Sequence, residues 1–115
     1  MSGQSYTLDT SATVTLNAAG TGTAIVSPPA VERWHVTRYA VVTNQSTTTT
    51  PIPLCKLYVN SVSDANLYDG TYTGNQDSGD ADLWLEKGQQ LIAQWTGGVP
   101  ASVGTLSIFG TRVSY

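Results

Sequence analysis

The sequence predicts an all-β protein, a single-domain antiparallel β-sandwich of about eight strands with a jelly-roll-like arrangement. Short runs in which apolar and polar residues alternate recur along the 115 residues, and this alternation is typical of half-buried strands. Clusters of Gly, Pro and Asn separate the runs about every ten residues, as in sandwiches and barrels. No run has the apolar spacing of an amphipathic helix.

The stretch 82–111 predicts three consecutive antiparallel strands with two tight connections. The first connection, 86–89, contains Gly88, where a positive φ is expected. The second connection is the breaker cluster 97–100. In each of the last two runs every second residue should face the core. These residues are Leu91, Ala93 and Trp95 in one run, and Leu106, Ile108 and Gly110 in the other. Trp84 and Trp95 are both expected to anchor the core rather than bind a ligand.

Four further strands are expected over 5–17, 21–27, 31–44 and 54–60. Residues 1–17 are interpreted as an arm with the first strand, and 18–115 as the body of one sandwich domain. Between 31 and 44 the alternation divides the side chains into two faces. We expect Trp34, Val36, Ala40 and Val42 on the core face, and Arg33, His35, Thr37, Tyr39 and Val41 on the other.

Composition excludes several classes of protein. Charged residues make up 11% of the chain, against about 25% in an average domain. The net charge of −3 and the scattered basic residues argue against a nucleic-acid surface. No run is long enough for a membrane helix, and no export signal opens the chain. The chain is therefore expected to be assembled in a cytoplasm, without binding a membrane or nucleic acid.

No combination of residues predicts catalysis or a cofactor. His35 is the one histidine and Cys55 the one cysteine. Cys55 lies in an apolar run and is expected to be a buried, inert thiol. His35 would need a serine and an acid brought to it, and no nucleophile motif is present. The sequence predicts neither an enzyme nor a disulfide.

Two ligand sites remain open alternatives in the acidic stretch 61–82. Asp77, Asp80 and Asp82, with Asn75, are weak candidates for calcium, which binds carboxylate and carbonyl oxygens. Their spacing differs from the EF-hand template, so a solvated acidic turn is the main interpretation. Tyr68 and Tyr72 near Trp84 are candidates for a glycan platform, although such aromatic residues are also ordinary in strands.

Two segments are expected to contact a partner: the N-terminal arm, Met1 to about Asp9, and the loop 45–53. The arm is polar and has no expected partner strand, so it could extend another subunit's sheet. The loop carries two prolines and is long for a hairpin. The candidate contact residues are Gln4, Tyr6, Thr47, Thr48, Thr49 and Pro51. Apolar residues expected on both faces of 31–44 also predict self-association, with a trimer favoured.

Several segments carry a resemblance to a known group of proteins. They are the acidic stretch 68–77, the run 83–91, the turn 95–98 and the closing run 104–112. In these segments the chain resembles small virion proteins of tailed bacteriophages that infect actinobacteria. The resemblance covers about residues 31–112 and is limited to strand and turn patterns.

The resemblance implies a non-enzymatic structural part of the virion. The favoured reading is a capsid decoration, or cement, protein that binds the head surface as a symmetric oligomer. The alternative is a minor tail protein or a receptor- or glycan-binding module at the tail tip. The expected partners are therefore a major capsid or tail protein and further copies of the chain.

Overall fold

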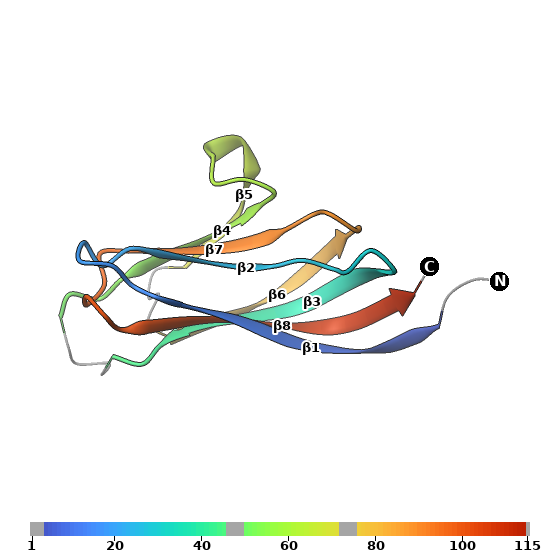
Figure 1. Ribbon diagram of the computed structural model, residues 1–115, viewed down its shortest axis with the longest axis horizontal. Helices are drawn as coiled ribbons and strands as arrows, with labels where there is room; N and C mark the ends of the chain where they lie inside the picture. Colours follow the sequence, from blue (N-terminus) through green and yellow to red (C-terminus); the bar gives the residue numbers. More distant parts are fainter. Residues whose placement is uncertain (1–3, 46–49, 72–75, 115) are drawn as a thin grey trace.

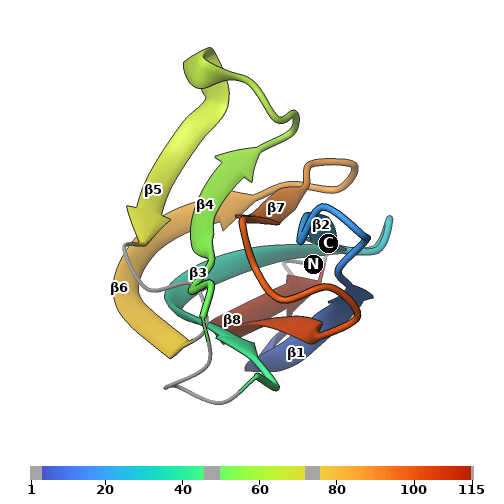
Figure 2. The same ribbon diagram turned by 90° about the vertical axis from the view of Figure 1, so that its left-hand side faces the viewer.

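The protein folds as two antiparallel β-sheets packed face to face, as the sequence predicts. The computed structural model describes residues 4–45, 50–71 and 76–114. Within these residues the first sheet has the strand order β1-β8-β3-β6 and the second has β2-β7-β4-β5. Figure 2 shows the two sheets lying one above the other. The elements are β1 (Ser5–Thr15), β2 (Gly22–Val26), β3 (Glu32–Thr43), β4 (Leu54–Val59), the 3₁₀-helix η1 (Asp64–Asn66), β5 (Leu67–Thr71), β6 (Gln76–Leu85), β7 (Leu91–Thr96) and β8 (Val103–Ser114).

The strand order is that of a jelly roll. β1 pairs with β8, β2 with β7, β3 with β6 and β4 with β5, so each pair lies inside the previous one along the chain. These pairs alternate between the two sheets, which is how a long antiparallel ribbon rolls into a sandwich. No helix among the described residues is long and apolar enough to cross a membrane.

The core lies between the sheets and contains the residues expected from the last two strands except Gly110, which is half-buried. Leu91, Ala93 and Trp95 point inward from β7, and Leu106 and Ile108 point inward from β8. Trp95 is fully buried, and Gly104 leaves room for its ring, because a Cβ there would lie 3.0 Å from Trp95 Cδ2.

Because of a β-bulge, the expected assignment of side chains to the two faces of β3 is wrong in the second half of the strand. The register of β3 with both β6 and β8 shifts between Val36 and Arg38. A bulge inserts one extra residue and reverses the alternation that follows it. As a result Tyr39 and Val41 are buried, whereas Ala40 is half-buried and Val42 is exposed. Trp34 and Val36, before the bulge, face the core as expected.

The expected succession of three adjacent strands in 82–111 is also wrong. The strands exist, but β6 and β8 belong to one sheet and β7 to the other. The connections therefore cross between sheets instead of closing hairpins. The first connection has the expected turn: the Gln89 N–H donates to the Glu86 carbonyl at 3.0 Å, and Gly88 has φ 81°.

Two other segments differ from expectation. The acidic stretch, interpreted from the sequence mainly as a solvated turn, contains β5 and the first half of β6. The expected arm is part of the sandwich from Ser5 onward, because β1 pairs with β8 from Ser5 to Thr15. Residues 1–3 lie outside the described part of the chain. Figure 1 shows β1 running beside β8 along the molecule.

Candidate interaction surfaces

An exposed aromatic stack lies on the outer face of β3 and β6. His35 and Trp84 are opposite one another in the register of the two strands. Their rings are parallel within 5°, with centroids 4.5 Å apart. The Arg33 guanidinium carbon lies 4.4 Å from the centre of the Trp84 ring. Trp84 is still 43% exposed, so the stack presents part of an indole to solvent.

Two carboxylates complete what we call the Trp84 cluster, which comprises Arg33, His35, Asp82, Trp84 and Glu86. Asp82 Oδ1 lies 2.7 Å from His35 Nε2, and Glu86 Oε1 lies 3.5 Å from Arg33 Nη1. Exposed ion pairs of this kind contribute little to stability. Their effect here is to restrict the two side chains that stack on the indole. The cluster therefore provides a positioned aromatic surface rimmed by charge, the kind of site that anchors protein interfaces.

Trp84 corrects the expectation that both tryptophans anchor the core. On β6 the side chains alternate, and Leu85 points inward and is fully buried. Trp84 must then point outward, because neighbouring residues of a strand face opposite sides. The register with β3 is what creates the cluster, so residue spacing along the chain gives no sign of it. If Leu83 and Leu85 are taken as the inward-facing residues of the run, the alternation predicts that Trp84 faces solvent.

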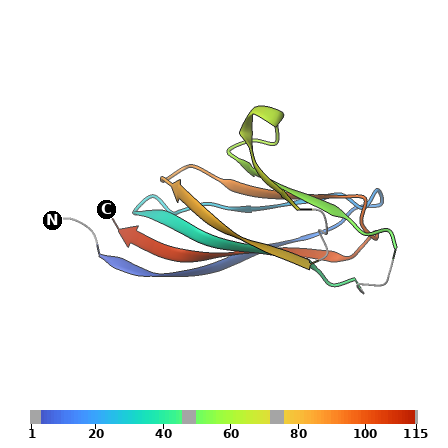
Figure 3. The ribbon, with the colours of Figure 1, turned by 180° about the vertical axis from the view of Figure 1, so that it is seen from behind.

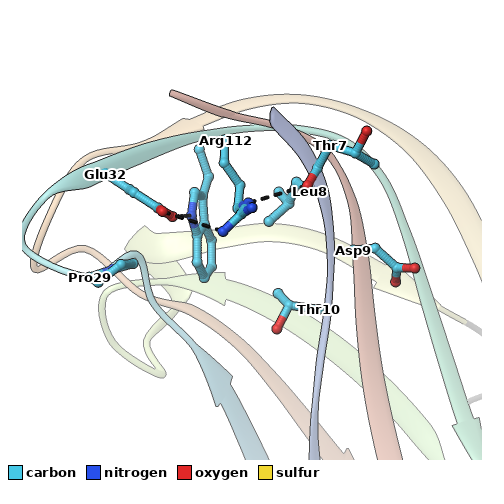
Figure 4. A pocket seen from close by; sticks show the side chains of 8 residues that line it. Thr7, Leu8, Asp9, Thr10, Pro29, Glu32 and Arg112 are labelled. Atoms are coloured by element: carbon cyan, nitrogen blue, oxygen red, sulfur yellow. Dashed lines mark hydrogen bonds and ion pairs between the residues drawn. The ribbon is translucent and has the colours of Figure 1, made fainter. Parts of the chain in front are cut away.

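A cleft of about 540 Å³ opens where β1, β8 and β3 meet the connection that follows β2 (Figure 4). Glu32 lines the cleft and binds two neighbours: Trp34 Nε1 donates to Glu32 Oε1 at 3.0 Å, and Arg112 Nη1 lies 3.4 Å from Glu32 Oε2. Arg112 Nε also donates to the Thr7 carbonyl at 3.2 Å. These contacts join β1, β3 and β8, so the charged pair serves to hold the end of the sandwich together.

The expected contact residues are far apart. The N–H of Gln4 donates to Ser114 Oγ at 3.0 Å, and Tyr6 is exposed, with the Arg112 guanidinium carbon 5.4 Å from its ring centre. Pro51 is exposed and its carbonyl accepts from Gln45 Nε2 at 2.9 Å. The remaining candidates, Thr47, Thr48 and Thr49, lie outside the described residues. Figure 1 places the start of β1 and the end of β3 at opposite ends of a molecule 52 Å long.

The calcium candidates are not brought together. Asp77 lies on one face of β6, whereas Asp80 and Asp82 lie on the other. Asp82 contacts His35 instead. Among the described residues, no group of three or more His, Cys, Asp or Glu side chains could hold a metal ion.

The expected glycan platform is not formed by Tyr68 and Trp84. Tyr68 packs against the core, and its hydroxyl accepts a hydrogen bond from the Asp82 N–H at 3.3 Å. Trp84 is on the outer face of its sheet, and Tyr72 lies outside the described residues. Of the two candidates in the described residues, Trp84 is the one whose ring is exposed.

The Cys55 thiol and the Tyr39 hydroxyl are two buried groups whose protons are held more tightly than usual. Burial, with a smaller contribution from Asp77, raises the pKa of the Cys55 thiol to about 12, so the reactive thiolate is suppressed. The Tyr39 hydroxyl donates a hydrogen bond to Asp69 Oδ2 and thereby links β3 of one sheet to β5 of the other. Burial and this hydrogen bond raise the pKa of the Tyr39 phenol. Sequence reasoning missed this link, which depends on the bulge.

The comparisons with known proteins show a likeness of fold to solved structures. No protein-family model and no curated protein matches the chain. The structure is similar to a chain in the acid-stable capsid of Helicobacter pylori bacteriophage KHP30, with a TM-score of 0.63 and 12% identity over 98% of this chain and 99% of that chain. It is also similar to a chain of Desmodium yellow mottle tymovirus, with a TM-score of 0.51 and 10% identity over 97% and 87%.

A third similar structure is not viral. It is a chain from Bacillus endospore appendages, described as disulfide-linked pili, with a TM-score of 0.51 and 10% identity over 97% of this chain and 89% of that one. At these identities the likeness is one of fold.

Proposed function

We propose that the chain is a non-enzymatic structural component of a tailed-phage virion. The observation that carries this is the similarity to a chain of a phage capsid structure over 98% of this chain. The three structures described above come from virus particles or from pili, and all of these are assemblies of repeated subunits.

Within the virion, the proposed role is a capsid decoration protein that binds the head surface as a symmetric oligomer. The Trp84 cluster supports a docking role, because Trp and Arg are the residue types that dominate binding energy at protein interfaces. The low content of charge supports binding through shape and hydrogen bonds. The phage in the comparison comes from Helicobacter, so the comparisons lend no support to an actinobacterial host.

The trimer favoured from the sequence loses its main argument. That argument placed Tyr39 and Val41 on a surface face of β3, and both side chains are buried in the core. The proposal therefore keeps a symmetric oligomer but takes its contacts from other strands.

The second candidate is a glycan- or receptor-binding module at the tail tip. The exposed indole of Trp84 favours it, because a flat aromatic face can stack on a sugar ring. A glycan array with the wild type and Trp84→Ala separates the two candidates. Binding to defined glycans that is lost in Trp84→Ala would support the tail-tip role, whereas a blank array with both proteins supports the decoration role.

Electron cryo-microscopy of particles of the virus whose genome encodes the chain tests the main proposal. We expect density on the outside of the head that fits a sandwich 52 Å long. Particles produced without the gene serve as the control and should lack this density. Absence of the protein from purified particles by mass spectrometry, or heads that are identical with and without the gene, would overturn the proposal.

A further inference from the structure

The sheet β1-β8-β3-β6 has two long edges, and they differ in how well they are protected. An open edge offers main-chain N–H and C=O groups to another strand, and natural proteins block such edges with charges, prolines and bulges. β6 carries Asp77, Asp80 and Asp82 within ten residues. Its pairing with β3 is also interrupted by the bulge. Figure 3 shows β6 running along one side of the molecule. This edge is protected against pairing.

β1 has fewer of these protections, although its Thr7 carbonyl accepts a hydrogen bond from Arg112 Nε. It is eleven residues long, contains no proline or lysine, and carries Asp9 as its one charge. Its register with β8 runs from Ser5 to Thr15 without a shift. In the described part of the chain no strand other than β8 pairs with β1. The outward-facing side chains are exposed and are nearly all hydroxyls: Ser5, Thr7, Asp9, Ser11, Thr13 and Thr15.

We propose that β1 is the surface through which two copies of this chain associate. β1 would pair antiparallel with β1 of the second copy across a two-fold axis, with Thr10 opposite Thr10. The two four-stranded sheets would then become one continuous sheet. Main-chain hydrogen bonds supply the affinity in such strand addition, so no large apolar or charged patch is needed.

The sequence of β1 is self-complementary in this register. Thr10 is the middle residue of Ser5–Thr15, so all eleven residues find a partner. Asp9 lies opposite Ser11 of the partner subunit, which avoids a contact between like charges. A register centred on Asp9 would instead place two carboxylates face to face, which is destabilising.

Both faces of the joined sheet also match in this register. Residues opposite one another share a face, because their positions differ by an even number. On the outer face, Thr7 meets Thr13 of the partner subunit, a favourable hydroxyl pair. On the inner face, Leu8 meets Ala12 of the partner subunit. A second copy of the chain is thus the occupant that fits this edge.

Paired substitutions at Thr7 and Thr13 test both the surface and the register. Within one chain the two positions are about 20 Å apart, at about 3.3 Å per residue, so their side chains do not interact. In the double variant Thr7→Lys/Thr13→Lys, each pair across the axis joins two ammonium groups. In the matched control Thr7→Lys/Thr13→Glu, each pair joins opposite charges. Both variants change the same two exposed positions.

Sedimentation equilibrium over a concentration series supplies the measurement. The wild type should reach twice the monomer mass of 12.1 kDa. The Lys/Lys variant should dimerise at least about ten-fold more weakly, and the Lys/Glu variant should remain close to the wild type. Circular dichroism checks that each variant is folded. Hydrogen exchange of the wild type adds a second measurement: exchange of β1 amides should slow as the protein dimerises.

Several results would overturn the proposal. They are a wild type that stays monomeric at every concentration, a Lys/Lys variant that dimerises as well as the wild type, equal weakening of both variants, and unchanged β1 exchange in a dimer. The proposal concerns contact between copies and does not depend on the virion role. A monomeric wild type would leave the particle experiment unaffected. Absence of the protein from particles would likewise leave the dimer experiment unaffected.

Discussion

At the scale of single residues, Trp95 and Trp84 show the same residue type in two different roles. Trp95 is fully buried between the sheets, and Trp84 is 43% exposed on an outer face. Trp95→Ala should lower the free energy of unfolding by about 3–5 kcal/mol, since it removes a large core side chain and leaves a cavity. Trp84→Ala loses only the exposed stacking contacts and should cost about 1 kcal/mol or less. Urea denaturation of both variants tests this, and equal losses would contradict the assignment.

Tyr39 predicts how stability should depend on alkaline pH. Burial and the hydrogen bond to Asp69 raise the pKa of the phenol in the folded state above its usual value of about 10. The folded protein then holds the proton at a pH where the unfolded chain releases it. The stabilisation is complete below about pH 10 and is lost progressively as the pH rises above it.

The control for this prediction is Tyr39→Phe. Between about pH 9 and 11, denaturant midpoints should fall more steeply for the wild type than for the variant. Because the two proteins differ at this one position, the difference between the two slopes isolates Tyr39. Parallel slopes would show that the phenol does not contribute.

At the scale of elements, the bulge in β3 depends on Gly110 of β8. A Cβ on Gly110 would lie 1.9 Å from the His35 carbonyl oxygen and 3.1 Å from the Thr37 nitrogen. Gly110→Ala should therefore force the two strands apart and destabilise the fold by about 1–3 kcal/mol or more. Gly70→Ala, on β5, is the matched control, because its Cβ would meet only Lys56 Cγ, at 4.0 Å. Thermal unfolding of the pair gives the comparison, and similar melting temperatures would rule out the close approach.

The same bulge marks the limit of what the sequence predicts. Where alternation is unbroken, as in β7 and β8, the inward residues follow from a period of two. The extra residue at the bulge leaves no local sign, because the glycine that accommodates it is on another strand. β5 was missed for a related reason: it carries Asp69 and Gly70, poor strand formers, and it exists through pairing with β4.

The candidate site, like the bulge, depends on pairing between strands and leaves no local sign in the sequence. The Trp84 cluster depends on His35 lying opposite Trp84, and their positions in the chain do not reveal that register. The buried nature of Cys55, by contrast, was predicted correctly from its apolar run, because burial within a strand is a local property.

At the scale of the whole molecule, the low charge predicts how attachment should respond to salt. With a net charge of −3 and 11% charged residues, binding to a particle should depend mainly on shape and hydrogen bonds. Raising the salt from about 0.05 to 0.5 M should release little protein, since salt screens only charge interactions. Retention on purified particles across the series is the measurement. Release by moderate salt alone would show that ion pairs dominate the contact.

The nesting of strand pairs, in which the first strand β1 pairs with the last strand β8, constrains how the protein folds during synthesis. The innermost pair, β4 and β5, can form while later strands are still being synthesised, but β1 must wait until β8, Val103–Ser114, has left the ribosome. Folding dominated by such distant pairings is slow, on the order of milliseconds to seconds. A nascent chain that stops before β8 would leave β1 and β3 without the strand that lies between them, and unpaired strands of this kind are prone to aggregate.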